Sequence, residues 1–246
     1  MRRFFIASDA LSEDMVLIAG EMWHYLSHVL RLKVGEKIEM LTEDKMLYVV
    51  ELASFEEKCI KGRIISAQEY TDDTKIEIKL YQGLPKGDKL DLIIQKCTEL
   101  GIKAITPVEM PRSIAKIGDK GEKKLARWQK IALEASQQSK RLQVPQINNP
   151  LSWKRFLEEI KDEEGLNLLL WEDESTVGLK SVLNQYPNAG KINIIIGPEG
   201  GLSADEAEEL KKMGIMSVSL GKRILRTETA GVAATAMILY HYDDLG

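Results

Sequence analysis

The sequence is poor in cysteine and histidine and has no long apolar run. Its two cysteines, Cys59 and Cys97, and its three histidines show no metal-ligand spacing, so we expect neither a disulfide framework nor a metal site. No stretch of about 18 apolar residues is present, so we expect no membrane-spanning helix. The N-terminal residues MRRFFIASDALSED lack the apolar segment of a signal peptide. Together these absences predict a protein of the reducing cytoplasm.

Phosphate-binding fingerprints are also missing, although residues 191–210, KINIIIGPEGGLSADEAEEL, have the plan of a phosphate loop. The β-branched run at 192–196 predicts a buried strand, and Ser203 with Glu206 predicts a capping box that begins a helix. The glycine turn between them matches neither G-x-G-x-x-G nor G-x-x-x-x-G-K-[ST]. It carries Glu199 and no cation, an arrangement that would repel a polyphosphate. We therefore expect a neutral or cationic ligand; an ordinary glycine turn with a solvated carboxylate is the alternative.

A second stretch, residues 217–242, SVSLGKRILRTETAGVAATAMILYHY, repeats the order of strand, loop and helix. Its loop, Gly221–Arg226, contains three cations. Thr227 is expected to cap the following helix, whose first turn carries Glu228 as the helix dipole favours. The small apolar residues from Ala230 to Met237 suit close packing, either in the interior or at a subunit interface.

The composition, 246 residues with 44% hydrophobic and 29% charged side chains, predicts a globular protein of one or two domains. Residues 1–70 have short alternating runs separated by polar turns, which predict a small β-rich domain with the shape of a compact barrel. The expected strands are 3–6, 37–41, 47–52 and 59–66, with one short helix at 24–31. The polar stretch YTDDT at 70–74 marks the expected domain boundary.

From residue 75 onward, strands alternate with helices, which predicts an α/β domain with a parallel sheet covered on both faces. The expected elements are strands 76–82, 103–108, 166–171, one at 192 and one at 218, and helices 88–100, 121–139, 176–185, one from 204 and a last one. Cys97 lies on the apolar stripe of helix 88–100, so it is expected to be buried, and Gly101 is expected to end that helix. Ligands of such folds bind at the carboxyl ends of the strands.

Positive charge is concentrated in the middle of a chain whose net charge is -4. Residues 112–141 contain nine cations and three acids. Such a cluster can bind a phosphate backbone even when the whole chain is acidic. A solvated helix face is the alternative explanation for the same pattern.

The two loops, IGPEGGLS and LGKRILRTETA, resemble the signature loops of the RsmE family, the 16S ribosomal RNA uridine-N3 methyltransferases of the SPOUT superfamily. Further similar motifs are KCTELG at 96–101, PRS at 111–113, WQKIALEASQQSKR at 128–141, MRRFF, and the pattern from His24 and His28 to Glu36. The resemblance therefore extends over nearly the whole chain.

This resemblance implies a PUA-like β-barrel RNA-binding domain at 1–70 and a SPOUT methyltransferase domain at 71–246. A deep trefoil knot is implied at about 166–246, with a homodimer formed through the knotted domain. The implied cofactor is S-adenosylmethionine, and the implied partner is 16S rRNA in the small ribosomal subunit. The implied cofactor residues are Leu170, Trp171, Glu172, Gly197, Pro198, Glu199, Gly200, Gly201, Leu220, Gly221, Ile224, Leu225, Arg226 and Thr227. The candidate RNA-binding residues are Arg2, Arg3, His24, Arg31, Lys96, Arg112, Gln138 and Arg141.

Methylation of uracil N3 requires loss of an imide proton, which assigns two candidate catalytic roles. Arg226 would stabilise or orient the base, and Glu228 would accept the proton. Glu228 has two alternative roles, as an acid favoured by the helix dipole or as the ion-pair partner of Arg226.

Three other functions stay open: a ribose 2'-O-methyltransferase, a noncatalytic RNA-binding assembly factor, and a nucleotide-dependent oxidoreductase, which the missing phosphate fingerprint disfavours.

Overall fold

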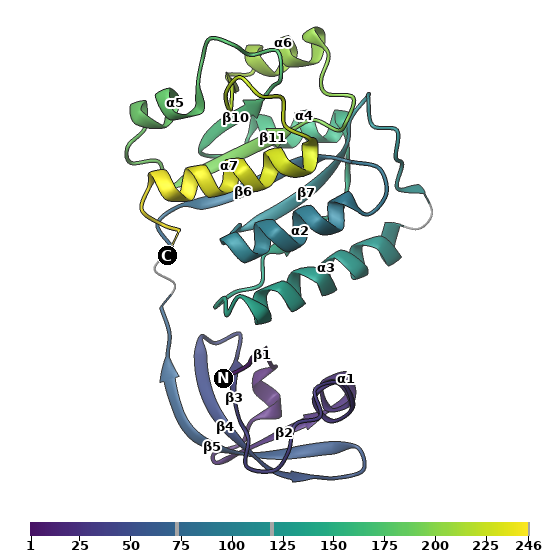
Figure 1. Cartoon of the computed structure of the whole chain (residues 1–246), viewed down its shortest axis with the longest axis vertical. Helices are drawn as coiled ribbons and strands as arrows, with labels where there is room; N and C mark the ends of the chain where they lie inside the picture. Colours follow the sequence, from purple (N-terminus) through teal and green to yellow (C-terminus); the bar gives the residue numbers. More distant parts are fainter. Residues whose placement is uncertain (72–73, 119–120, 246) are drawn as a thin grey trace. The chain divides into compact units, whose positions relative to one another are not determined.

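The computed structural model describes residues 1–71, 74–118 and 121–245, and the chain forms two compact units (Figure 1). The first unit contains the chain up to residue 73 together with Gln137–Leu142, and the second contains the remainder. The segment Gln137–Leu142 lies inside the expected second domain in sequence but packs with the first unit. Arg3 donates to the carbonyl of Lys140, and the Tyr70 hydroxyl donates to the carbonyl of Leu142 at 3.0 Å.

The first unit is built on a curled five-stranded sheet with the order β1-β3-β4-β5-β2 (Figure 1). Its elements are β1 (Arg3–Phe5), η1 (Ser8–Ala10), β2 (Met15–Ala19), β3 (Lys37–Leu41), β4 (Met46–Phe55) and β5 (Cys59–Glu69). The β1–β3 pair is parallel and the other pairs are antiparallel. The predicted strand 37–41 is confirmed with its bounds and the other three with shifted ends, whereas β2 was not predicted. In β2, Val16 and Ile18 alternate into the core with exposed neighbours.

The helix predicted at 24–31 begins and ends earlier in the structure. An α-helical turn, α1 (Gly20–His24), continues into a π-helical turn, η2 (Tyr25–Val29). Leu26 is fully buried and anchors this segment to the core of the first unit. The expected last residue, Arg31, lies outside the helix with a positive φ of 52°.

The second unit contains an all-parallel sheet with the order β12-β10-β11-β6-β7-β8, and β9 pairs with β7. Its strands are β6 (Glu77–Gly83), β7 (Ala104–Glu109), β8 (Gln146–Ile147), β9 (Leu151–Ser152), β10 (Leu166–Leu170), β11 (Lys191–Ile196) and β12 (Met216–Val218). The predicted parallel sheet is therefore confirmed. Leu170 lies opposite both Ile196 and Val218, so three strands end at one edge of the sheet.

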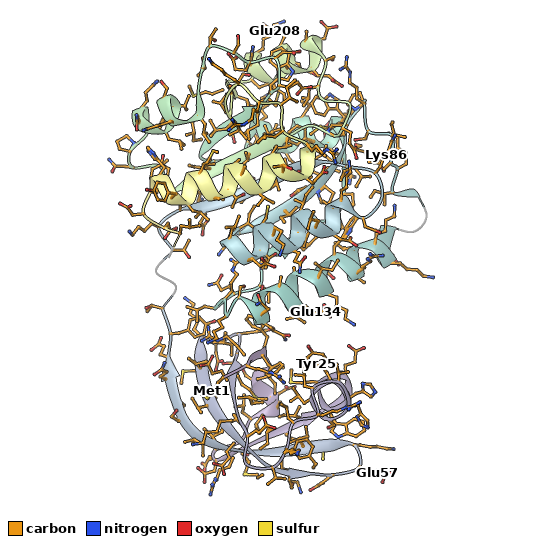
Figure 2. All side chains as sticks on the ribbon, in the orientation of Figure 1. Met1, Tyr25, Glu57, Lys86, Glu134 and Glu208 are labelled. Carbon is orange, nitrogen blue, oxygen red and sulfur yellow. The ribbon has the colours of Figure 1, made fainter. Side chains whose placement is uncertain are left out.

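Helices cover both faces of this sheet, and side chains fill the space between the layers (Figures 1 and 2). One face is covered by α2 (Lys89–Leu100), α3 (Gly121–Gln138), α5 (Leu179–Gln185) and α7 (Thr227–His241), and the other by α4 (Trp153–Lys161) and α6 (Ala204–Lys212). Successive side chains of a strand point into the two cores in turn: on β11, Ile194 lies in one core and Ile195 in the other. Such two-sided burial explains the nearly continuous apolar runs of β10 and β11.

Local end signals predicted two helix ends correctly and one incorrectly. Gly101 ends α2 in the left-handed conformation with φ 116°, and both bonds of the Ser203–Glu206 capping box are present. Thr227 is not the cap of α7: Arg226 occupies that position and Thr227 is the first helical residue. The hydroxyl of Thr227 bonds instead to the carbonyl of Gly197 at 2.6 Å, because this residue is buried against the glycine loop.

The predicted burial of Cys97 is confirmed, and this burial raises the pKa of its thiol to about 12.

The small residues of α7 also pack inside the second unit. Gly231 lies close to Leu80 and Ile196, and Ala234 is fully buried. The small-residue face therefore covers the sheet, while Met237 is 46% exposed on the same helix.

Candidate active site

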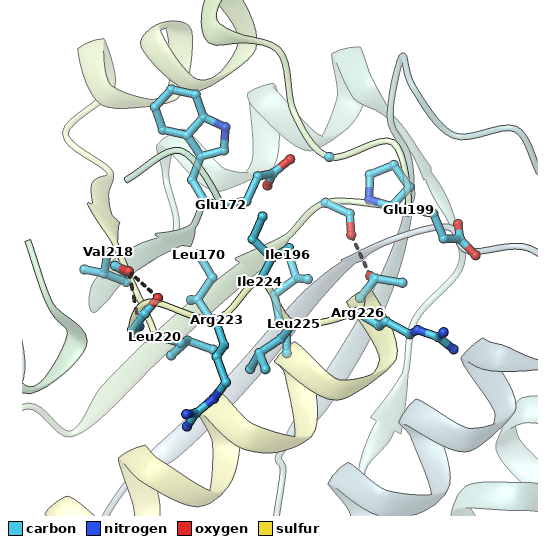
Figure 3. Close-up of a pocket in the computed structure, with 18 of the residues that line it drawn as sticks. Leu170, Glu172, Ile196, Glu199, Val218, Leu220, Arg223, Ile224, Leu225 and Arg226 are labelled. Atoms are coloured by element: carbon cyan, nitrogen blue, oxygen red, sulfur yellow. Dashed lines mark hydrogen bonds between the residues drawn. The ribbon is translucent and has the colours of Figure 1, made fainter. Parts of the chain in front are cut away.

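A cleft of about 440 Å³ lies where β10, β11 and β12 end, and the loops after these strands line it (Figure 3). Thirteen of the fourteen expected cofactor residues lie around it: Leu170, Trp171, Glu172, Gly197, Pro198, Glu199, Gly201, Leu220, Gly221, Ile224, Leu225, Arg226 and Thr227. Gly200 does not line the cleft. Its carbonyl accepts a hydrogen bond from Arg112 at 3.1 Å. The structure thus brings together residues that are up to 57 positions apart in the sequence.

A buried hydrogen-bond network joins the glycine loop to the start of α7. The side-chain amide of Gln82, at the end of β6, donates to Thr227 Oγ1 at 2.8 Å, and Thr227 donates to the Gly197 carbonyl. Gln82 is fully buried. Because an unpaired buried donor is costly, this network holds the loop and the helix in one arrangement.

The glycines of this region are needed because protein atoms approach them closely. A Cβ at Gly83 would lie 2.5 Å from the backbone nitrogen of Pro198, and one at Gly197 would lie 2.7 Å from Leu202 Cδ1. Gly201 has φ +63° and lies against the carboxylate of Glu172. The glycines in the sequence predicted that the backbone comes close to another group. In the structure, that group is another part of the same chain.

The N-terminus of α6 is closed by its own side chains. Glu206 accepts from the backbone N–H of Ser203 at 2.6 Å, and the Ser203 hydroxyl accepts from the N–H of Glu206 at 3.2 Å. These bonds occupy donors that a phosphate would need at a helix N-terminus. The geometry therefore agrees with the interpretation that this loop does not bind a polyphosphate.

The charged side chains of Lys89 and Glu199 line the cleft, and Lys89 also pairs with Glu228, which is not among the lining residues. Lys89, the first residue of α2, lies 2.8 Å from Glu199 Oε1 and 3.5 Å from Glu228 Oε2. The hydrogen bond to Glu199 raises the pKa of Lys89. Burial opposes ionisation of Glu199, but hydrogen bonds from Lys89 and from backbone N–H groups hold its pKa below the ordinary value. Glu228 is therefore paired with Lys89, so its alternative role as the ion-pair partner of Arg226 is wrong.

Arg226 lies in the cleft wall with an exposed side chain. In the described part of the chain, its guanidinium has no ion pair or hydrogen bond. Figure 3 shows that Arg226 and Glu199 extend on the same side of the cleft, while Arg223 extends toward the opposite side. The guanidinium of Arg226 is thus available to a ligand of the cleft.

The loop after β10 is held by one aromatic and one acidic side chain. The Trp171 indole N–H donates to the Leu202 carbonyl at 3.3 Å, and the ammonium of Lys211 lies 4.9 Å from the indole ring centre. Glu174 accepts from the hydroxyl of Thr176 at 2.7 Å and from backbone N–H groups of 176 and 177. The Thr176 hydroxyl and these N–H groups lower the pKa of Glu174 to about 2.

The eight candidate RNA-binding residues are divided between the two units. Six lie in the first unit, namely Arg2, Arg3, His24, Arg31, Gln138 and Arg141, and two lie in the second, Lys96 and Arg112. Arg3 is paired with Glu39 at 2.9 Å, and Lys96 is paired with Glu99 at 2.9 Å. Arg112 supports the glycine loop through Gly200. One cation of the basic helix α3 is paired within the second unit, because Arg127 forms an ion pair with Asp91 of α2.

Seven residues line the cleft that sequence reasoning did not select: Lys89, Ile196, Val218, Ser219, Lys222, Arg223 and Ala230. Lys222 and Arg223 belong to the cationic loop that the sequence singled out, so their position beside the chosen residues was a usable signal. Lys89 gave no such signal, because it lies 110 positions before Glu199 in the sequence.

Within residues 1–71, 74–118 and 121–245, no group of three or more His, Cys, Asp or Glu side chains is placed to hold a metal ion. In the same residues, no helix combines the length and apolar character needed to cross a membrane.

A family model for an RNA methyltransferase domain matches residues 72–239. Ribosomal RNA small subunit methyltransferase E from Bacillus subtilis is 35% identical over 248 residues, which cover 98% of this chain and 96% of that protein. This chain belongs to the methyltransferase E family. The family member from Synechocystis is 32% identical over 96% of this chain and 76% of its own length.

A solved structure of a methyltransferase E from Neisseria gonorrhoeae, bound to S-adenosyl methionine, has the same fold. It aligns with a TM-score of 0.85 and 30% identity, covering 98% of this chain and 97% of that one. The similarity to the methyltransferase E family therefore includes both units and the cleft between the strand ends.

Proposed function

We propose that this protein transfers a methyl group from S-adenosylmethionine to N3 of a uridine in the 16S rRNA of the small ribosomal subunit. The single observation that carries the proposal is the cleft at the three strand ends in a chain that matches methyltransferase E over 98% of its length. Uridine N3 is the atom implied by the signature loops of residues 196–203 and 220–230. A 16S rRNA substrate implies a cytoplasmic site of action.

The cleft has the size and the lining that S-adenosylmethionine requires. Its volume of about 440 Å³ lies within the range of small-molecule sites, and Leu170, Ile196 and Leu225 offer apolar contacts for an adenine ring. The wall carries both signs of charge, as the zwitterionic S-adenosylmethionine requires: the carboxylates of Glu172 and Glu199 and the cations of Lys89, Lys222, Arg223 and Arg226. S-adenosylmethionine, when bound, supplies an activated methyl group on a sulfonium sulfur.

The protein's own side chains then act on the base. Arg226, whose guanidinium has no partner among the described residues, binds and orients the uracil oxygens and stabilises the charge that develops on them. Glu228 is the proposed acceptor of the N3 proton; the support is its buried Oε2 atom, which accepts no hydrogen bond from the described residues and is held only by an ion pair with Lys89 at 3.5 Å. The fixed loops hold the two reactants in line, which removes much of the entropic cost of the reaction.

The proposal includes a PUA-like β-barrel for the RNA-binding first domain, residues 1–70. Its support is the curled sheet and the exposed positions of Arg2, His24 and Arg31. Exposed arginines bind phosphates without reading sequence. Arg3, Lys96, Arg112, Gln138 and Arg141 are the remaining candidates for RNA contacts.

The proposal also includes a trefoil knot at about 166–246 within a methyltransferase domain at 71–246. β12 pairs with β10 on the side opposite β11, and the chain then returns to α7, which packs on β6 and β11. On the way, Ser219 is hydrogen-bonded to Val177, in the loop after β10, and to Leu179, the first residue of α5. These contacts and the tight approach of Gly83 to Pro198 are the support for the proposed knot.

A homodimer formed through the same domain completes the proposal. Met237 and Tyr240 on α7 are 46% and 75% exposed, and with Leu179, Leu183 and Leu220 they line an apolar groove next to the cleft. Exposed apolar surface of this kind marks an interaction site. The interface therefore uses the exposed face of α7 rather than its small residues, which pack inward.

The test is methyl transfer from labelled S-adenosylmethionine to small-subunit RNA taken from cells that lack this gene, followed by digestion to nucleosides. We expect label in 3-methyluridine. Label in a 2'-O-methylated nucleoside would keep the cofactor and overturn the substrate atom. No transfer and no binding of S-adenosylmethionine in calorimetry would favour a noncatalytic RNA-binding factor.

A further inference from the structure

Lys89 occupies a position in the cleft that helix stability does not explain. It is the first residue of α2, where the positive end of the helix dipole disfavours a cation. Two carboxylates from distant parts of the chain, Glu199 and Glu228, compensate its charge, and its side chain lines the cleft. The lysine thus joins α2, the glycine loop and α7 at the place where a ligand binds.

The two carboxylates are not equivalent. Glu199 accepts from Lys89 at 2.8 Å and also from the backbone N–H of Lys86 at 3.1 Å. Glu228 Oε2 is buried and accepts no hydrogen bond from any described residue, and the ammonium of Lys89 lies 3.5 Å away. An ammonium has three N–H donors, of which Glu199 uses one. Glu228 Oε2 is thus held only at ion-pair distance by Lys89, and the ammonium retains an N–H donor for a further acceptor.

We propose that Glu228 and Lys89 together recognise the imide edge of the target uracil, with Lys89 as the residue that specifies uracil. The inference rests on the proposed transfer to uridine N3. In uracil the N3–H donor lies between two carbonyl acceptors. Glu228 Oε2 accepts the N3–H, and Lys89 donates to the neighbouring carbonyl oxygen. Cytosine presents an unprotonated N3 beside an amino donor, so it leaves both protein groups unsatisfied.

The same contact contributes to the reaction. N3 forms its bond to the methyl carbon as its proton passes to Glu228, and the electron pair of the broken carbon–sulfur bond stays on sulfur. Negative charge that develops on N3 and on the flanking oxygen lies beside the Lys89 ammonium. A cation fixed at that point stabilises the transition state more than the bound uracil.

The test compares Lys89→Met with wild type in single-turnover methylation of small-subunit RNA at saturating cofactor and RNA. We expect the rate to fall about 100-fold, as for loss of one transition-state donor. The dissociation constant of S-adenosylmethionine, measured by calorimetry, should stay within about threefold, a change too small to be a lost specific contact. RNA containing 5-fluorouridine, whose N3–H is more acidic, should recover part of the lost rate in Lys89→Met.

Lys86→Met is the matched control, because the Lys86 side chain is exposed outside the cleft and only its backbone bonds to Glu199 (Figure 2). We expect it to keep the wild-type rate. Lys89→Arg, which retains the charge, should keep more activity than Lys89→Met. If Lys89→Met does not fold, Lys89→Gln replaces it in every arm of the test.

Several outcomes would overturn the inference. A wild-type rate in Lys89→Met, an equal loss in Lys86→Met, or no recovery with 5-fluorouridine would each exclude Lys89 from the imide contact. A loss confined to RNA affinity would make Lys89 a phosphate-binding residue. Failure of wild type to form 3-methyluridine would overturn the proposed function itself, so the two failures are distinguishable.

Discussion

At the scale of single residues, Arg226 and Glu228 are close in the sequence but differ in their surroundings. Arg226 is exposed in the cleft wall, whereas Glu228 is half-buried beside Lys89. The sequence placed both residues at the loop–helix junction because loop cations and a first-turn acid are local signals. The pairing of Glu228 was not predictable, because Lys89 approaches it only through the packing of α2 against α7.

The first prediction concerns Arg226→Ala. We expect the single-turnover rate of methylation to fall about 100-fold or more, because a guanidinium that stabilises developing charge is lost. The affinity for S-adenosylmethionine, measured by calorimetry, should change little, since backbone groups and apolar side chains dominate the cleft. Arg155→Ala, an exposed arginine on α4, is the control. Equal losses of rate and cofactor affinity would make Arg226 a cofactor-binding residue only.

A second prediction concerns Glu174, whose pKa is lowered to about 2 by the Thr176 hydroxyl and backbone N–H groups. A carboxyl with a depressed folded-state pKa stabilises the fold above its unfolded pKa of 4.5, and this contribution is lost as pH falls from 4.5 toward 2. Glu174→Gln should therefore lower the free energy of unfolding by about 2 kcal/mol at pH 7. Urea unfolding at pH 7 and pH 3 should show a smaller difference at pH 3. An unchanged difference would contradict this account.

At the scale of secondary-structure elements, the sequence predicted what local pattern determines. The apolar run at 192–196, the capping box at Ser203 and the αL glycine Gly101 are all formed by neighbouring residues. The helix α4 was missed although Ser152 caps it and Phe156 and Ile160 follow at helical spacing. The two-residue strands β8 and β9 had no period to detect, since a pattern of two residues fits any element.

The third prediction tests the close approach of β6 to the glycine loop. Gly83→Ala would place a Cβ 2.5 Å from the backbone nitrogen of Pro198, so the loop must shift. We expect a loss of about 1–3 kcal/mol in the free energy of unfolding. Gly190→Ala is the matched control, because no atom lies within 4 Å of its Cβ. Equal free energies of unfolding for the two variants in urea would show that the glycine loop shifts without loss of stability.

At the scale of the whole molecule, the two units differ in how far the sequence anticipated them. The change from alternating strands to strand–helix order near residue 75 is visible in the sequence. The packing of Gln137–Leu142 with the first unit is not, because it depends on contacts such as Tyr70 with Leu142. The alternating runs predicted a barrel, but its PUA-like character, the knot and the dimer came from family resemblance alone, since no local pattern encodes threading or association.

The fourth prediction concerns the dimer. Tyr240→Glu places a charge on the exposed face of α7, in the apolar groove beside Met237. We expect sedimentation equilibrium to show a monomer, since burying an unpaired carboxylate disfavours association. Lys154→Glu, an exposed position on α4, is the control and should remain dimeric. A dimeric Tyr240→Glu variant would move the interface away from this groove.

The proposed methylation of uridine N3 is tested in cells by the amount of 3-methyluridine in 16S rRNA, quantified by nucleoside mass spectrometry in three strains. One lacks the gene, and the other two express wild type or Arg226→Ala in its place. We predict that 3-methyluridine is absent without the gene, restored by wild type and strongly reduced with Arg226→Ala. An unchanged amount of 3-methyluridine in the strain without the gene, with a different methylated nucleoside lost, would contradict the account.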